Sequence, residues 1–142
     1  MILYLDASAL VKLYIDEDGA TVARSAVRDA EIVATCEIAY VEARAALARR
    51  YRERALSRSG YRGAIRDLEA DWPQFFLVAA RGPLIREAAA IAEQYALRAY
   101  DALHLAAGVA TKGDATEDVL FACWDPNLSA AAVKTGLRVL PE

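Results

Sequence analysis

The sequence predicts an α/β protein, a three-layer α/β/α sandwich with a mainly parallel central sheet. Short apolar runs recur at five places along the chain, and stretches with helical spacing of apolar residues separate them. Strands that alternate with helices usually form a parallel sheet covered by helices on both faces. With 142 residues the chain has the length of one ordinary domain, so we expect a single domain over residues 1–142.

The first expected strand is the run Ile-Leu-Tyr-Leu at residues 2–5, because an unbroken apolar run is typical of a strand buried on both faces. Further strands are predicted at residues 31–35, 75–79, 119–123 and 137–140. The predicted helices cover residues 8–14, 19–30, 37–57, 59–71 and 82–97, with two more that begin at Asp101 and Pro126. Residues 112–118 are mostly polar and are predicted to be a loop.

Composition excludes several classes of protein. No apolar segment approaches the roughly 18 residues of a membrane span, and the first residues lack the basic start of a signal peptide. We therefore expect a cytoplasmic protein that does not contact a membrane. Cys36 and Cys123 lack the spacing of metal ligands or of a redox pair, so we expect both to be buried as small hydrophobic residues. Glycine-rich nucleotide-binding motifs are absent from the sequence.

Basic residues are concentrated in one segment, although the net charge is -3. Eight of the 17 basic residues lie within 23 positions in which Glu53 is the only acid. They are Arg44, Arg49, Arg50, Arg52, Arg54, Arg58, Arg62 and Arg66. Such a run is usually a solvated helical face, and the alternative is a strip that contacts nucleic-acid phosphates.

Four carboxylates occupy positions where a ligand site is expected. Asp6 and Asp125 each follow an apolar strand, and ligands of open α/β sheets bind beyond the carboxyl ends of the strands. Asp101 opens a helix with apolar residues at core spacing, and Glu42 is expected to face inward beside an apolar stripe of helix 37–57. That stripe is predicted to comprise Ile38, Val41, Ala45 and Ala48.

Each of these acids also has a purely structural interpretation. Asp101 and Asp125 could cap the helices that they precede, and Asp6 could end its strand in a turn. Glu42 could form an ion pair with a nearby arginine of its own helix. The candidates for that pair are Arg44 and Arg49.

If the four acids converge, they require a counter-charge. Two carboxylates about 5 Å apart repel each other by roughly 3 kcal/mol at an effective dielectric constant near 20. Oxygen ligands without a histidine or cysteine cluster favour Mg²⁺, with Mn²⁺ as a substitute, over zinc. Such a cation supports hydrolysis of a phosphodiester by activating a water and stabilising charge on the phosphate.

Five stretches of the chain resemble a PIN domain of the VapC toxin type: LDASALVKLY, EIAYVEARAAL, RAYDALHLAAG, FACWD and GLRVLP. The resemblance spans nearly the whole chain, with the motifs in the expected order. It implies an endoribonuclease that depends on Mg²⁺ or Mn²⁺, a small antitoxin as partner, and a homodimer or a toxin–antitoxin hetero-oligomer. It also implies an acidic site of Asp6, Glu42, Asp101 and Asp125, in which Asp6 and Asp101 are the surest metal ligands.

Three further residues bear on this site. Ser8, in the pattern Asp-x-Ser, would orient the first carboxylate or a water. Many relatives have Thr or Ser at the position of Cys123, which is a much weaker hydrogen-bonding group, so the role of Asp125 is left open. His104, the only histidine, is predicted to be structural because its helix is apolar on that side.

The expected mechanism is in-line attack by a metal-bound water, which leaves a 5′-phosphate and a 3′-hydroxyl. Glu42 or Asp125 would accept the proton of the water or bind a second ion. Flanking phosphates would contact Arg49, Arg52 and Arg66, which could border one groove across two helices. The alternative is a PIN-fold module that binds RNA or protein without catalysis. A haloacid-dehalogenase-like phosphatase would require a second Asp where Ser8 stands.

Overall fold

The computed structural model describes residues 1–113 and 118–142. The loop predicted at 112–118 therefore lies largely outside the described residues. Five strands form one parallel sheet in the order β3-β2-β1-β4-β5. They are β1 (Ile2–Leu5), β2 (Ile32–Cys36), β3 (Phe76–Val78), β4 (Val119–Ala122) and β5 (Arg138–Leu140). The predicted parallel sheet is confirmed, and β1 is its central strand.

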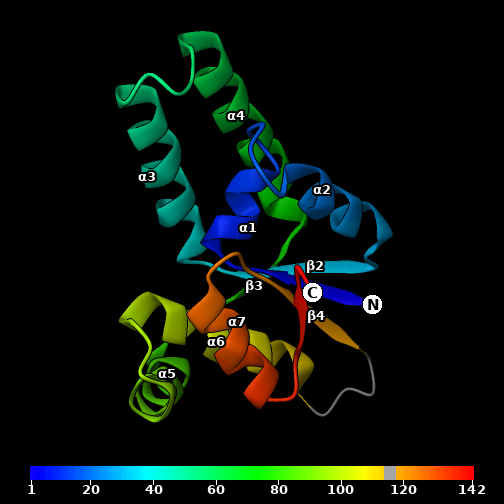
Figure 1. Cartoon of the computed structure of the whole chain (residues 1–142), viewed down its shortest axis with the longest axis vertical. Helices are drawn as coiled ribbons and strands as arrows, with labels where there is room; N and C mark the ends of the chain where they lie inside the picture. Colours follow the sequence, from blue (N-terminus) through cyan, green and yellow to red (C-terminus); the bar gives the residue numbers. More distant parts are fainter. Residues whose placement is uncertain (114–117) are drawn as a thin grey trace.

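Helices cover both faces of this sheet, as Figure 1 shows. One layer contains α1 (Ala7–Lys12), α2 (Ala20–Asp29), α3 (Ala39–Arg52) and α4 (Arg58–Asp71). The other contains α5 (Gly82–Tyr95), α6 (Ala99–Lys112) and α7 (Pro126–Lys134). A short 3₁₀ turn, η1 (Trp72–Gln74), joins α4 to β3. The predicted three-layer α/β/α architecture is thus confirmed, and none of the described helices is long and apolar enough to cross a membrane.

The alternation of side chains along β1 divides the hydrophobic core into two parts. Leu3 and Leu5 point into the cluster under α1, α3 and α4, whereas Ile2 and Tyr4 point into the cluster under α5, α6 and α7. All four strand residues of β1 are buried, because β1 has neighbours on both edges and helices on both faces. The residue that follows, Asp6, therefore emerges from the centre of the molecule.

Two helix boundaries and one helix face differ from the sequence-based prediction in ways that affect the site. Helix α3 ends at Arg52 instead of residue 57, and Arg54 adopts a positive φ of 60° in the turn before α4. Helix α6 begins at Ala99, so Asp101 lies inside its first turn and does not open it. The predicted stripe of α3 is wrong, because Val41 is 61% exposed. The residues of α3 that are buried are Ala39, Ala43 and Leu47.

Helices α3 and α4 form a long hairpin that projects away from the sheet, with their connection at its far end (Figure 1). The start of α4 is capped by Ser57, whose hydroxyl oxygen accepts a hydrogen bond from the Gly60 N–H at 3.0 Å. The N-terminal part of α3 lies beside the carboxyl ends of the strands, and the arginine-rich residues 49–66 occupy the distal part of the hairpin.

Candidate active site

Asp6 caps α1 from the end of the central strand. Its Oδ1 accepts hydrogen bonds from the Ala9 N–H at 2.9 Å and from the Ser8 hydroxyl at 2.6 Å. Asp6 is thus the N-cap of α1, a role that was not predicted for it from the sequence, and the residue also lines a cavity. Asp6 is only 5% exposed, and burial raises the pKa of its carboxyl, with a smaller contribution from nearby Asp101.

Ser8 connects this carboxylate to the neighbouring strand. Its hydroxyl donates to Asp6 and its oxygen accepts the backbone N–H of Trp124 at 3.1 Å. Trp124 follows β4 and precedes Asp125, so one serine fixes the end of β1 to the end of β4. Both carboxylates consequently leave the same edge of the sheet from fixed backbone positions.

Asp101 and Asp125 share one arginine. Arg98 Nε donates to Asp101 Oδ2 at 3.0 Å, and Arg98 Nη2 lies 3.6 Å from Asp125 Oδ2. The other oxygen of Asp125 accepts the Leu128 N–H at 2.9 Å and caps α7. The predicted cap at Asp125 is therefore present, whereas the cap at Asp101 is wrong, because Arg98 is the N-cap residue of α6 and makes no side-chain cap.

Glu42 is held by a histidine and not by the arginines proposed for it. Its Oε1 lies 2.6 Å from Nε2 of His104, whose Nδ1 lies 2.8 Å from the hydroxyl of Tyr4. The candidate arginines have other partners. Arg44 pairs with Glu69, and Arg49 pairs with Glu53.

One cavity of about 340 Å³ brings these groups together. It is lined by all four predicted acids, by Ser8 and His104, and by Ala7, Arg98, Trp124 and Pro126. Within residues 1–113 and 118–142, no three Asp, Glu, His or Cys side chains are grouped closely enough to hold a metal ion in this arrangement. The cavity contains the predicted acids, and the single charge of the Arg98 guanidinium offsets part of the negative charge of Asp101 and Asp125.

The donor chemistry fits a hard divalent cation. Carboxylate and hydroxyl oxygens surround the cavity, and His104 is already engaged through both ring nitrogens. Arg98 has an 81% exposed side chain, so it can leave the two aspartates without disturbing the core. A bound Mg²⁺ or Mn²⁺ would then supply the positive charge beside these aspartates in place of Arg98.

Cys123 lies beside this cavity but is closed off from it. It is fully buried, and its Sγ lies 3.1 Å from the Ser129 hydroxyl. Burial raises the pKa of the Cys123 thiol to about 12. The prediction that Cys36 and Cys123 are buried small residues is confirmed, and both thiols are free.

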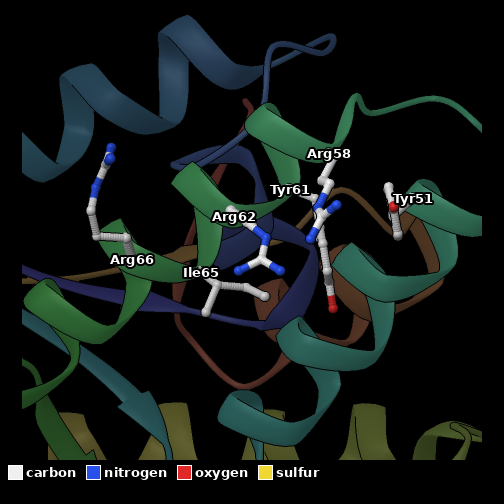
Figure 2. A pocket seen from close by; sticks show the side chains of 6 residues that line it. All are labelled: Tyr51, Arg58, Tyr61, Arg62, Ile65 and Arg66. Carbon is white, nitrogen blue, oxygen red and sulfur yellow. The ribbon is translucent and has the colours of Figure 1, made fainter.

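The arginines proposed as phosphate contacts lie in two separate places. Arg49 and Arg52 line a hollow of about 680 Å³ on α3. Arg66 belongs to a different pocket of about 460 Å³, in which Figure 2 shows its side chain pointing away from Arg58 and Arg62. Arg49 and Arg52 thus line one hollow and Arg66 another, and a groove that all three border stays a prediction.

Three residues that line or support the site were not predicted. Arg98 and Trp124 line the cavity, and Tyr4 supports His104 from below. For Tyr4 a signal existed, because it precedes Asp6 by two residues and residues two apart share a face of a strand. Arg98 opens the stretch RAYDALHLAAG, three residues before Asp101, but no role was assigned to it from the sequence.

Comparison with known proteins agrees with this architecture. The family model described as "PIN domain" matches residues 3–121. Two Mycobacterium tuberculosis proteins, ribonuclease VapC45 of strain CDC 1551 and ribonuclease VapC49 of strain H37Rv, are each 36% identical over 140 residues. In both cases the match covers 99% of this chain and 95% of the relative.

Solved structures share the fold at lower sequence identity. FitAcB from Neisseria gonorrhoeae superposes with a TM-score of 0.67 at 19% identity, over 98% of this chain and 96% of that chain. PAE2754 from Pyrobaculum aerophilum gives a TM-score of 0.61 at 22% identity, with 96% and 98% covered. VapBC2 from Rickettsia felis, bound to a DNA fragment from their promoter, gives 0.60 at 12% identity, with 98% and 97% covered.

Proposed function

Because the chain belongs to the PIN domain family, we propose that it is an endoribonuclease that requires Mg²⁺ or Mn²⁺ and acts as the toxin of a toxin–antitoxin pair. The observation that carries this proposal is the cavity in which Asp6, Glu42, Asp101 and Asp125 meet at the carboxyl ends of β1 and β4. The four acids around this cavity supply the oxygen donors that a hard cation prefers. The 36% identity to two ribonucleases supports RNA as the substrate.

Asp6 and Asp101 are the residues that would hold the cation, and Glu42 or Asp125 could hold a second. The bound cation supplies an activated water and stabilises charge on the phosphate. Ser8 orients Asp6 by donating to its Oδ1, which leaves Oδ2 as the ligand oxygen. Glu42 has one oxygen on His104, so its Oε2 is the atom that would accept the proton of the attacking water. Cleavage by in-line attack would leave a 5′-phosphate and a 3′-hydroxyl.

RNA would extend from the cavity along α3. Arg49 lies seven residues after Glu42, which is close to two full turns, so both side chains leave the same face about 10 Å apart along the helix axis. Arg52 lines the same hollow as Arg49. Arg66 would contribute only if the RNA also reaches the second pocket on α4.

The partner that fits this proposal is a small antitoxin, since a cell survives a toxic ribonuclease only while the enzyme is inhibited. An Arg or Lys of that partner could replace Arg98 between Asp101 and Asp125, because the two carboxylates already accept a guanidinium. A homodimer or a toxin–antitoxin hetero-oligomer is the expected assembly. Co-expression with the product of an adjacent short reading frame, followed by pulldown, tests this part of the proposal.

Cleavage of RNA with and without metal tests the activity. We expect cleavage with Mg²⁺ or Mn²⁺ and none in EDTA, and we expect Asp101→Asn to abolish cleavage while the matched surface variant Glu87→Gln retains it. Cleavage that persists in EDTA, or an active Asp101→Asn variant, would refute the mechanism. RNA binding without cleavage by the wild-type protein in Mn²⁺ would favour the alternative, a binding module of the same fold.

Binding of the cation has an independent readout. A ligand present at 100 times its dissociation constant stabilises the folded state by about 2.7 kcal/mol. For a chain of this length that corresponds to a rise of roughly 9 °C in Tm. Calorimetry in EDTA and in excess Mn²⁺ should show such a shift for the wild type and a much smaller one for Asp101→Asn.

A further inference from the structure

A second layer of polar side chains lies directly beneath the acids. Tyr4 precedes Asp6 by two residues on β1, and His104 follows Asp101 by three residues on α6. These spacings place Tyr4 on the same face as Asp6, and His104 on the same face of α6 as Asp101. Tyr4 is fully buried and His104 is 2% exposed, so only an edge of His104 reaches the cavity and the layer is otherwise closed to solvent.

The hydrogen bonds of this layer lead to one oxygen of Glu42. The Tyr4 hydroxyl lies 2.8 Å from His104 Nδ1, and His104 Nε2 lies 2.6 Å from Glu42 Oε1. The Tyr4 ring stacks on Phe121 at 5.2 Å between ring centroids, and the His104 ring meets Tyr4 edge to face at 6.0 Å. Packing therefore fixes both rings, and among the described residues no buried side-chain nitrogen or oxygen lacks a hydrogen-bond partner.

The chemistry of these groups defines where the proton between His104 and Glu42 lies. The ionised Glu42 carboxylate can only accept, so Nε2 of His104 must donate to it. The Tyr4 hydroxyl can donate or accept, so it can bond to Nδ1 of His104 whether or not that nitrogen carries a proton.

We propose that His104 is a positioning residue for Glu42: it donates from Nε2 to Oε1 of Glu42 and is itself held in place by the hydroxyl of Tyr4. The pair fixes Oε1 of Glu42 as a hydrogen-bond acceptor and leaves Oε2 for the reaction. The inference deepens the proposed function, on which it rests, because it explains how a carboxylate on a helix that carries many arginines is oriented toward the cavity. It also revises the expectation that His104 is only structural.

The protonation of Nε2 can be measured directly because the chain contains a single histidine. In metal-free protein labelled with ¹⁵N-histidine, NMR at neutral pH should show a proton on Nε2. Tyr4→Phe removes the hydroxyl but keeps the ring that stacks on Phe121, and it should shift the Nδ1 signal. The matched variant Tyr95→Phe, which also loses one tyrosine hydroxyl, should leave both signals unchanged. A histidine without a proton on Nε2 would overturn the proposal.

Binding of Mn²⁺, followed by EPR of the free ion, supplies the second readout. Loss of an outer-shell partner typically weakens metal affinity about 10-fold to 100-fold, so we expect at least a 10-fold weakening in His104→Leu. Tyr4→Phe should cost about fivefold, the effect of one hydrogen bond. His104→Gln, whose amide can still donate to Glu42, should recover part of the affinity.

These outcomes separate the two proposals. A wild-type protein that does not bind Mn²⁺ contradicts the proposed function, while the NMR experiment still decides whether Nε2 carries a proton. Wild-type binding of Mn²⁺ with unchanged affinity in folded His104→Leu and Tyr4→Phe contradicts the positioning role alone. Circular dichroism establishes that each variant is folded, and Tyr4→Phe is the decisive variant if His104→Leu does not fold.

Discussion

Removing Arg49 and Arg52 together should weaken RNA binding in a way that depends on salt. Both arginines line the hollow on α3, and Arg49 leaves the same face of the helix as Glu42. Arg49 pairs with Glu53 at 3.0 Å, but both side chains are more than half exposed, and such surface pairs contribute little to stability. The double variant Arg49→Ala/Arg52→Ala is therefore expected to fold normally.

The magnitude follows from counterion release. Each phosphate contact on single-stranded nucleic acid contributes about 0.7 to the slope of log affinity against log salt, so two lost contacts lower the slope by about 1.4. Between 50 and 200 mM salt, such a change corresponds to a factor of about 7. The wild type should accordingly bind much more tightly than the variant at low salt, and this advantage should shrink about sevenfold over that range.

Fluorescence anisotropy with a short labelled RNA measures this effect at several salt concentrations. An Asp6→Asn background prevents cleavage, and Asn caps the start of a helix about as well as Asp does. The matched control is Arg28→Ala/Arg86→Ala, which removes the same charge from exposed positions elsewhere. If both double variants lose the same affinity and slope, only net charge matters. An unchanged slope in Arg49→Ala/Arg52→Ala would refute the contacts.

Three further predictions concern stability and reactivity. Burial raises the folded-state pKa of Asp6 above its ordinary value of 3.8, so the folded protein holds the carboxyl proton more tightly than the unfolded chain does. The stabilisation that comes from this bound proton is complete in acid and is lost as pH rises through the folded-state pKa. Asp6→Asn should therefore gain stability over the metal-free wild type toward neutral pH, and a pH-independent difference in Tm would contradict this. Gly108→Ala places a Cβ 2.6 Å from Cδ2 of buried Phe121 and should cost about 1–3 kcal/mol, lowering Tm by roughly 3–10 °C in calorimetry; an unchanged Tm would show that the ring moves freely. Cys36 and Cys123, whose pKa values burial raises, should react with a thiol reagent only after denaturation, so rapid labelling of the native protein would contradict the closed packing.

The sequence was sufficient to predict the sheet and its acidic edge. Unbroken apolar runs identify strands covered on both faces, and an acid at the end of such a run must lie at the rim of the sheet. For this reason Asp6 and Asp125 could be placed before the structure was known. The boundaries of the five strands agree to within one or two residues.

The buried face of a helix was harder to predict, because alanine is compatible with both buried and exposed faces. Helix α3 offers two stripes at nearly the same spacing, and the one that packs contains Ala39, Ala43 and Leu47, while the larger Val41 is exposed. The partners of Glu42 and Asp101 depend on contacts between elements distant in the sequence, such as α3 with α6. No local pattern specifies that His104 reaches Glu42 across 62 positions.

The position of β1 at the centre of the sheet has a consequence for synthesis on the ribosome. Strand β1 ends at Leu5 and its partner β4 begins only at Val119, so Asp6 is synthesised well before Asp125. In a nascent chain that has not yet released β4, Asp6 has no Asp125 beside it, and the serine that joins the two strand ends has no Trp124 to bind. The cavity is therefore completed only after Trp124 and Asp125 have been synthesised, long after Asp6.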